Sequence, residues 1–600
     1  MISRLDCEAV VKKLSNTSII SLDTETSGLR VWDKDFFFSV IIADSEQEYY
    51  FNFQQYPGLD PEFILTKHEL PLIQDIFNNK EQTIYMANAK FDLAALYRRG
   101  IEIHGVVKDV LMGARLLCND HLSYSLDECA KREGLVKSDA VEKFISENHL
   151  WEWEEIPGKK LRSKRMFFNR VPVSIMEEYG CKDARITYDL GIKYDAQILE
   201  VSEKMPSGIP TLSQVWANEI NLTKVCFEME RVGIKIDRSY CEKAYFFEKG
   251  NCQRAKEHFK SICGIDFVDS NKALTEAFKS VGIAPGKTEK GNPSFTDAIL
   301  ENVNHDLAQA VRDYREAYKK ATTYFQSFLY FSDSESVVHP NIRQAGTTTG
   351  RFSCSEPNCQ NLSKEEGAQN YKVRDAFIPR EDFCFVEFDY KAFEYRMMAE
   401  YAGELELIEK IKAGQDVHQA TGEMMGVSRK TAKTLNFMLL YGGGAQKLAD
   451  ALELSLEEAK LLKQKYFAAL PKVRQFIHAV TNTAERRGFI FNWLGRRYNF
   501  SDRSFCYKAP NALIQGGTAD IVKVAMNRIA EVLKPCQSRM ILQVHDSLLF
   551  EIHKTELALL PVIKDILETS YPHKYLQMEV SQSYSWESWG KLKEGTPEAP

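Results

Sequence analysis

Two apolar segments that end in an aspartate most constrain how this chain can fold. Residues 383–390 read FCFVEFDY, the pattern of a buried strand that ends near Asp389. Residues 543–551 read QVHDSLLFE, the pattern of a β-hairpin with His545 and Asp546 at or near its turn. An ionised carboxylate is costly beside so much apolar surface unless something pairs with it. The fold must therefore give these aspartates a partner.

Length and composition predict a globular protein of several domains. A chain of 600 residues is too long for one core, and its 44% hydrophobic and 27% charged residues are ordinary for such proteins. The apolar run FFFSVIIA (36–43) is too short to cross a bilayer, and the N-terminus has no signal-peptide core, so we expect no membrane association. The 13 scattered cysteines, never arranged as C-x-x-C, favour reduced thiols in the cytoplasm. The net charge of −7 neither indicates nor excludes a nucleic-acid partner.

Acidic side chains recur at the ends of elements in the first third of the chain. Residues 17–29 form an apolar strand that carries Asp23 and Glu25 on one face, and two more strands follow. Residues 83–100 predict a strand, a turn and a helix that starts near Asp92. Residues 177–190 predict a helix with Tyr179 and Asp183 on one face. Four acids placed in this way can hold two divalent ions, which activate water and stabilise the leaving oxygen in phosphodiester cleavage.

The order D-x-E, N-x-x-F-D and Y-x-x-x-D resembles the three signatures of DEDD-type 3′→5′ proofreading exonucleases, whose domain has an RNase H-like fold. The resemblance implies an active site whose metal ligands are Asp23, Glu25, Asp92 and Asp183. It implies that Tyr179 orients the attacking water and that Asn88 supports the second signature.

The segment 158–170 (GKKLRSKRMFFNR), between the second and third signatures, contains six basic residues. Two interpretations stay open. It is a solvated loop, or it contacts a phosphate backbone while Phe167 or Phe168 stacks on a base.

The middle of the chain is helical. Apolar spacing predicts helices over 214–233, ending at Gly233, and over 306–330. The segments MERVGIKID and YREAYKKATTYF resemble the thumb of family A DNA polymerases. The interval from Glu230 to Arg351 is short for the thumb insertion of some phage members, so we expect no processivity partner of that type.

Further matches to family A follow in order. The segment 339–362 resembles the family's T-G-R…Q-N element, which implies that Arg351, Gln360 and Asn361 contact primer–template DNA. The segment 383–403 resembles motif A, although Lys391 and Ala392 replace the usual Ser-Gln. This match implies Asp389 as a metal ligand assisted by the Tyr390 carbonyl, Glu394 as the steric gate against a ribose 2′-hydroxyl, and Arg396 as the motif's arginine.

Residues 429–444 place two cations and two aromatics at steps of four on a helix. An amphipathic core helix is the plainer interpretation, but core stripes rarely begin with paired charges. Cations suit an incoming triphosphate, and a flat ring suits its base. The run resembles motif B, which implies nucleotide contacts from Arg429, Lys433, Phe437 and Tyr441, with Lys433 also donating a proton to pyrophosphate. Phe437 in place of tyrosine implies discrimination against dideoxynucleotides.

Three weaker matches complete the set. His418 occupies a position similar to a nucleotide-binding histidine of the family, although a lone histidine is usually structural. The segments 493–500 and 511–520 match template-strand and palm elements, with Arg497, Asn511 and Gln515 as DNA-contact candidates.

The resemblance returns to the two strand-end aspartates. It implies that Asp389 and Asp546 pair through two shared metal ions, Mg²⁺ with Mn²⁺ as an alternative, two in each active site. Without ions the two carboxylates would repel and one would bind a proton. Ser547 replaces the family's usual glutamate after Asp546, which predicts weaker metal binding without loss of chemistry. Glu551 is a downstream acid whose reach to the site the sequence leaves open.

The expected fold class is α/β and α+β: an RNase H-like exonuclease domain (1–205), then a right-hand polymerase domain (206–600). We expect a thumb at about 214–335, a palm at about 336–400 and 505–600, and fingers at about 401–504. We expect no preceding 5′ nuclease domain, because the D-x-E signature begins at position 23.

The leading hypothesis is a monomeric DNA polymerase that uses primer–template DNA and dNTPs and proofreads its product. We expect it in the cytoplasm, which is the host cytoplasm if a phage encodes the protein. One alternative is an exonuclease whose second half only grips DNA. Another is a DNA clamp without catalysis. Primer extension with dNTPs and magnesium separates them.

Overall fold

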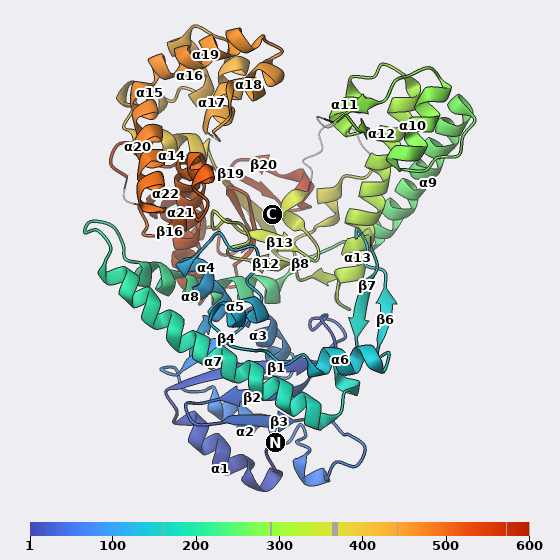
Figure 1. Cartoon of the computed structure of the whole chain (residues 1–600), viewed down its shortest axis with the longest axis vertical. Coiled ribbons are helices and arrows are strands. Elements are labelled where there is room, and N and C mark those ends of the chain that lie inside the picture. The colour runs from blue at the N-terminus through green and yellow to red at the C-terminus, as the bar shows by residue number, and fades with distance from the viewer. Residues whose placement is uncertain (160, 289–290, 363–369, 441, 572, 599–600) are drawn as a thin grey trace.

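The computed structural model describes residues 1–159, 161–288, 291–362, 370–440, 442–571 and 573–598. Figure 1 shows an N-terminal body below and two helical projections above, on either side of a C-terminal sheet. Among the described residues, no helix combines the length and apolar character needed to cross a membrane. The cysteine thiols are free, as predicted.

The N-terminal body is built on a mixed sheet of order β3-β2-β1-β4-β5. β1 runs antiparallel to β2 and parallel to β4, and β2 is buried along its whole length. The predicted three-stranded start is confirmed. The strands are β1 (Ile19–Thr26), β2 (Phe37–Ala43), β3 (Glu48–Asn52), β4 (Thr83–Met86) and β5 (Val106–Asp109).

Helices cover this sheet, and the long helix α7 packs on β1 and β2. Asn88, in the left-handed region (φ 63°), turns the chain from β4 into α3 as predicted. The helices of the body are α1 (Arg4–Ser15), α2 (Leu70–Ile76), α3 (Ala89–Tyr97), α4 (Val110–Leu117), α5 (Leu126–Arg132), α6 (Ala140–Glu147) and α7 (Val173–Glu203).

The basic segment after α6 is not simply a solvated loop. It contributes one strand of a hairpin, in which β6 (Trp151–Glu154) pairs antiparallel with β7 (Ser163–Met166), and a 3₁₀ turn at Phe168–Arg170 follows. Lys160 lies outside the described residues. The aromatic residues of β6 explain the strand, because they pack well on a pleated surface.

The right-hand projection in Figure 1 is helical. α8 (Leu212–Val232) precedes it in the chain and packs on α21, α3 and α7. It starts with a capping box from Thr211 and Gln214 and ends at Gly233 (φ 58°), as predicted. The other helices are α9 (Arg238–Cys263), α10 (Asn271–Ser280), α11 (Asp297–Glu301), α12 (Asp306–Tyr318) and α13 (Ser327–Phe331). The short strands are β8 (Ile234–Lys235), β9 (Gly286–Lys287), β10 (Pro293–Ser294) and β11 (Val337–Val338).

The predicted helix over 306–330 exists but is not α-helical throughout. A π-helical segment, Lys319–Gln326, separates α12 from α13. The apolar spacing marks the buried side of the helix, and it does not reveal that the turns widen there.

The central sheet is antiparallel, with order β17-β18-β14-β19-β20. α14 follows β14 directly, and α21 packs on α14. The strands are β14 (Phe383–Tyr390), β17 (Arg539–Val544), β18 (Ser547–His553), β19 (Val580–Ser585) and β20 (Lys593–Glu594). The helices are α14 (Phe393–Ala402), α21 (Ala509–Leu533) and α22 (Leu559–Thr569). The predicted motif-A strand and 543–551 hairpin are confirmed.

The left-hand projection in Figure 1 carries α15–α19. Its helices are α15 (Leu405–Lys412), α16 (Val417–Met425), α17 (Arg429–Leu440), α18 (Ala445–Leu452), α19 (Leu456–Ala469) and α20 (Pro471–Arg487). Two short hairpins complete the fold: β12 (Asn341–Arg343) with β13 (Ser353–Ser355), and β15 (Phe489–Phe491) with β16 (Arg497–Asn499).

Candidate functional site

Asp389 lies on β14, and Asp546 lies in the turn between β17 and β18, at the same end of the central sheet. In the β14–β18 register, Asp389 stands opposite Ser547. The backbone N–H of Tyr390 donates to the carbonyl oxygen of Asp546 at 3.1 Å. The backbones of the two segments are therefore adjacent here, and Asp389 is close enough to raise the pKa of Asp546, despite their separation along the chain.

The surroundings of Asp546 favour a cation. Burial, opposed by Arg351 and reinforced by Glu394 and Asp389, raises the pKa of Asp546 to about 6. Arg351 lies 3.6 Å from an Asp546 carboxylate oxygen and forms an ion pair with Glu394. The predicted DNA contact Arg351 thus pairs with Glu394, the predicted steric gate, and lies beside Asp546, a predicted metal ligand.

Ser547, which replaces the family's usual glutamate, and the downstream acid Glu551 each have hydrogen-bond partners within the protein. The Ser547 hydroxyl donates to the Val544 carbonyl at 3.1 Å. The fully buried Glu551 forms an ion pair with Arg380 and accepts from its backbone N–H at 3.0 Å. Glu551 is five residues farther along the chain than Asp546, about 16 Å at strand spacing. Glu551 therefore does not take the place of the missing ligand.

The predicted nucleotide stripe lies on the solvent side of α17. Arg429, Lys433 and Phe437 are exposed, whereas Ala432 and Leu435 between them are buried. This pattern contradicts the plainer interpretation that the stripe faces the core. The Arg429 guanidinium is held by both carboxylate oxygens of Asp416, at 2.9 and 3.0 Å. Tyr441, the fourth member, lies outside the described residues.

His418 is buried behind this stripe. Its Nδ1 lies 3.0 Å from the side-chain amide of Asn436, and its ring centroid is 5.6 Å from that of Phe437. His418 is thus in contact with the predicted nucleotide residue Phe437 from the protein side.

The predicted DNA contacts are spread over several elements. Arg351 and Gln360 line a cavity of about 40 Å³ beside Asp546, and the Gln360 amide donates to the Gln543 side chain at 2.8 Å. Asn361 is exposed. Arg497 stacks on the Phe489 ring at 4.3 Å and lines a cavity of about 690 Å³.

The remaining predicted DNA contacts lie on α21. Asn511 and Gln515 are one helical turn apart, and both are half-buried. The buried amide oxygen of Asn511 has no hydrogen-bond partner among the described residues. Such an orphaned acceptor suits a ligand at this place.

The four N-terminal acids come from three elements that meet in the first body. Asp23 and Glu25 lie on β1, Asp92 lies in the first turn of α3, and Asp183 lies on α7 with Tyr179 one turn before it. Burial, then Asp183, raises the pKa of Asp23 to about 7, and burial raises that of Asp183 to about 6. The acids thus repel one another, as metal ligands without their ion should.

These acids fit a divalent cation in chemistry. The buried Oδ1 of Asp183 has no hydrogen-bond partner among the described residues, so a lone pair is available to an ion. Within that same part of the chain, no three His, Cys, Asp or Glu side chains are already gathered tightly enough to enclose a metal.

Two further residues of this site escaped the sequence analysis. The Lys137 ammonium lies 2.7 Å from Asp183 Oδ2 and 4.9 Å from the Tyr179 ring centroid. The Thr24 hydroxyl donates to Asp92 at 2.6 Å. Thr24 sits between two acids and could have been considered, whereas Lys137 lies in a short loop segment without periodicity.

Comparison with known proteins decides the family. The description "DNA polymerase family A" matches residues 243–591, more than half of the chain. The chain belongs to DNA polymerase family A. A second description, "3'-5' exonuclease", matches residues 4–195 of this polymerase. The two families imply dependence on divalent metal ions, and their order confirms the predicted fold class.

Relatives support the assignment over different lengths. DNA polymerase I of Treponema pallidum is 27% identical over 559 residues, covering 88% of this chain and 53% of the relative. The thermostable DNA polymerase I of Thermus thermophilus is 32% identical over 392 residues, covering 61% and 47%. The chain thus spans about half the length of these curated relatives. DNA polymerase DpoZ of Salmonella phage PMBT28 is 26% identical over 596 residues, covering 90% and 91%.

A solved structure shares the fold of this family A polymerase. It is the polymerase domain of Pol1 from M. smegmatis, in complex with DNA primer-template and dNTP. The TM-score is 0.78 at 24% identity, over 98% of this chain and 99% of that one.

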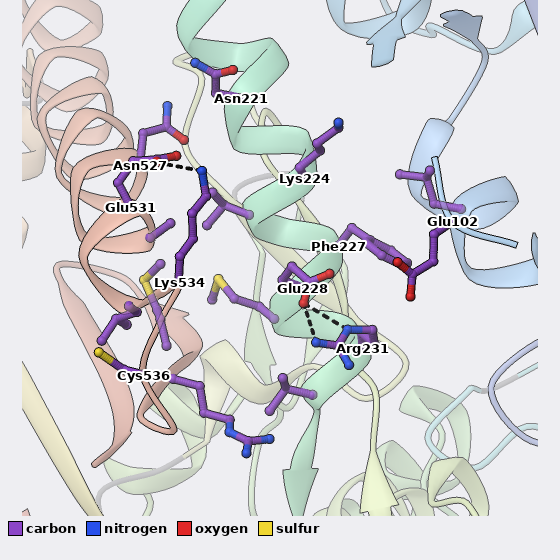
Figure 2. A pocket seen from close by; sticks show the side chains of 18 of the residues that line it. Glu102, Asn221, Lys224, Phe227, Glu228, Arg231, Asn527, Glu531, Lys534 and Cys536 are labelled. Carbon is purple, nitrogen blue, oxygen red and sulfur yellow. Dashed lines mark hydrogen bonds and ion pairs between the residues drawn. The ribbon is translucent and has the colours of Figure 1, made fainter. Parts of the chain in front are cut away.

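The protein also has a cavity of about 1120 Å³ away from both acid clusters. Figure 2 shows it between α8, the end of α21 and the loop that contains Glu102. Ion pairs line it, Arg231 with Glu228 and Lys534 with Glu531, and none of the predicted site residues does. Its mixed charge does not favour one class of ligand.

Proposed function

We propose that this protein synthesises DNA on a template, by nucleotidyl transfer from dNTPs to a primer 3′-hydroxyl, and removes mispaired ends by 3′→5′ hydrolysis. The observation that carries the synthetic half is the pairing of β14 with β18, which sets Asp389 beside Asp546. Membership of family A supports the same reaction.

Asp389 and Asp546, with the Tyr390 carbonyl, would hold two Mg²⁺ ions in the synthetic site, with Mn²⁺ as an alternative. Bound there, the ions would lower the pKa of the primer hydroxyl and stabilise the leaving pyrophosphate. Arg351 would compete with such ions for the Asp546 carboxylate, which it approaches at 3.6 Å. If displaced from it, Arg351 would be available to contact DNA.

The incoming nucleotide would bind along the exposed side of α17. Arg429 and Lys433 contact the triphosphate, Lys433 donates a proton to pyrophosphate, and Phe437 stacks near sugar and base, with His418 behind it. Tyr441 belongs to the same proposal. Glu394, buried beside the metal site, acts as the gate against a 2′-hydroxyl.

Primer–template DNA would lie against the predicted contacts of the palm and its neighbouring elements. Phosphate contacts position a duplex, whereas base-edge contacts near the primer end test its shape. The polar groups proposed for this surface are Arg351, Gln360, Asn361, Arg497, Asn511 and Gln515.

Proofreading would use the second acid cluster. Asp23, Glu25, Asp92 and Asp183 would hold two further Mg²⁺ ions, and Tyr179 would orient the attacking water. Burial raises the pKa of both Asp23 and Asp183, and Asp183 raises that of Asp23 further, which supports this proposal. We keep the domain limits of 1–205 and 206–600, and the thumb, palm and fingers within them, as part of the proposal.

Extension of a primer with a 3′ mismatch tests both halves. With dNTPs and Mg²⁺, the wild type should remove the mismatch and extend. Asp23→Ala should leave the mismatch in place yet extend a matched primer, and Asp546→Ala should degrade primers without extending them. Extension by Asp546→Ala would contradict the synthetic site. Degradation without extension by the wild type would favour an exonuclease whose second half only grips DNA.

A further inference from the structure

The β6–β7 hairpin joins the exonuclease body to the thumb-side projection. On one face, Glu154 accepts from the Tyr330 hydroxyl at 2.6 Å, and Arg165 pairs with Asp35 at 3.0 Å. At the tip, Lys159 lies 3.3 Å from Glu356. Figure 1 shows the hairpin beside α13. This face and the tip are therefore fixed by the rest of the protein.

The opposite face of the hairpin carries aromatic rings and a cation. Trp153 pairs with Lys164 and Trp151 with Met166 in the strand register, so these four side chains share one face. The Lys164 ammonium lies 4.2 Å from the Trp151 ring centroid and 5.6 Å from that of Trp153. Trp153 is 53% exposed. Exposing a tryptophan beside a lysine is unusual without a partner, and this pair suits the base and phosphate of a nucleotide.

This face leads toward the exonuclease acids. Trp151, Met166 and Phe168 pack against the apolar cluster that contains Tyr179. A second cation–aromatic pair follows on the chain, because the Arg170 guanidinium lies 4.1 Å from the Phe167 ring centroid. Cations and rings therefore continue from the exposed Trp153 to the wall of the acid cluster.

The basic residues of this segment differ in whether they already have an acidic partner. Arg162 and Arg165 are engaged with Glu155 and Asp35. Lys164 and Arg170 have no acidic partner within 4 Å among the described residues, and both are exposed. Among the described cations of this segment, Lys164 and Arg170 thus remain available, and both lie on aromatic rings, where a nucleic-acid strand gains both stacking and charge.

We propose that the face formed by Trp151, Trp153, Lys164 and Met166 binds the single-stranded 3′ end of a primer on its way to the exonuclease acids. The inference rests on the proposed exonuclease function and extends it with a binding surface. Bases stack on Trp153, and Lys164 contacts a phosphate. A duplex presents no free base faces, so this surface selects frayed ends.

The test compares two substrates of the full-length protein in Mg²⁺. The first is a twelve-residue oligothymidylate, and the second is the p-nitrophenyl ester of thymidine 5′-monophosphate, which fills only the cleavage site. Trp153→Leu should raise the KM for the oligonucleotide about tenfold, since stacking contributes roughly 1–3 kcal/mol per base. The KM for the ester should stay unchanged, because the ester does not reach Trp153. Trp153→Phe keeps a ring and should recover most of the loss.

Lys164→Gln gives an independent readout. It should raise the oligonucleotide KM and reduce the dependence of log KM on log salt by about 0.7, the value for one phosphate contact to a single strand. Lys143→Gln is the matched control, because Lys143 is an exposed lysine of the same domain on α6. It should leave both the KM and the salt slope unchanged.

The outcomes separate the two levels of the proposal. Wild-type cleavage of both substrates, with an unchanged oligonucleotide KM in Trp153→Leu and Lys164→Gln, overturns the hairpin inference alone. A parallel loss on both substrates also overturns it, because the substitution then acts on the acid cluster. No cleavage of either substrate by the wild type contradicts the exonuclease function itself.

Discussion

Ser547 stands opposite Asp389 in the sheet, so a side chain at position 547 lies on the same face as the proposed metal ligand. A carboxylate there would add an oxygen ligand to the site. We predict that Ser547→Glu lowers the Mg²⁺ concentration for half-maximal primer extension severalfold. Metal titrations of the extension rate measure this. Glu551→Gln is the control and should leave the metal requirement unchanged, and a shift there equal to that of Ser547→Glu would contradict the assignment.

The raised pKa of Asp23 predicts a pH-dependent stability in EDTA. An acid whose pKa is raised by folding favours the folded state below its unfolded pKa of 3.8, and this contribution disappears as the pH rises through about 7. Asp23→Asn removes the titration. The melting temperature of the variant minus that of the wild type should therefore increase from pH 4 to pH 7 and then level off. Melting curves at several pH values test this, and a constant difference would contradict it.

Residues with a chemical signature could be predicted from the sequence, but their partners could not. The acids of the D-x-E signature and the strand-end aspartates could be recognised because a carboxylate beside apolar strands is costly unless a partner compensates its charge. The pairing of Arg351 with Glu394, and of Lys137 with Asp183, depends on loops brought together from distant segments. No local pattern encodes such contacts.

At the scale of elements, α17 presents its cations to solvent on a rigid helical face. We predict that Lys433→Ala lowers kcat for nucleotide addition by about 100-fold, the lower range for loss of a general acid. Lys430→Ala, an exposed neighbour outside the stripe, is the control. Single-turnover extension measures the rates. Similar losses in both variants would show that helix charge, rather than the position of Lys433, matters.

A buried charge network fixes α8 to α21. Glu219 lies 2.6 Å from the Lys523 ammonium, and Arg496 pairs with both Glu219 and Asp520. Although burial opposes ionisation, Lys523 and Arg496 hold the pKa of Glu219 below its usual value. Glu219→Ala should destabilise the protein by about 3–5 kcal/mol, because it leaves a buried cation without its acid.

Urea unfolding of Glu219→Ala measures this loss as a lower midpoint. Adding Lys523→Met should recover part of it, since the uncompensated charge is then gone. Additive losses in the double variant would contradict the pairing.

Elements with a strong period were predictable, and elements defined by tertiary contact were not. The strand before Asp389 and the helix that ends at Gly233 follow from local sequence. The apolar spacing of the π-helical segment Lys319–Gln326 is the same as that expected of an α-helix, so it does not reveal the π-helix. The β6–β7 hairpin lies in a segment whose many basic residues give no sign of strand pairing.

At the scale of the whole molecule, two acid clusters lie in separate folding units of one family A chain. The order of the signatures along the sequence was enough to predict this division, because each signature belongs to a known type of domain. The sequence was silent about how the units contact each other. The structure supplies those contacts through α8 and the β6–β7 hairpin.

The most direct test of the central claim is the position of manganese in crystals of the protein with primer–template DNA and a non-hydrolysable dNTP. Anomalous scattering should locate two Mn²⁺ ions between the carboxylates of Asp389 and Asp546, with Arg351 moved away from Asp546. Absence of manganese at Asp546, or an Arg351 still paired with it in a complete complex, would contradict the account.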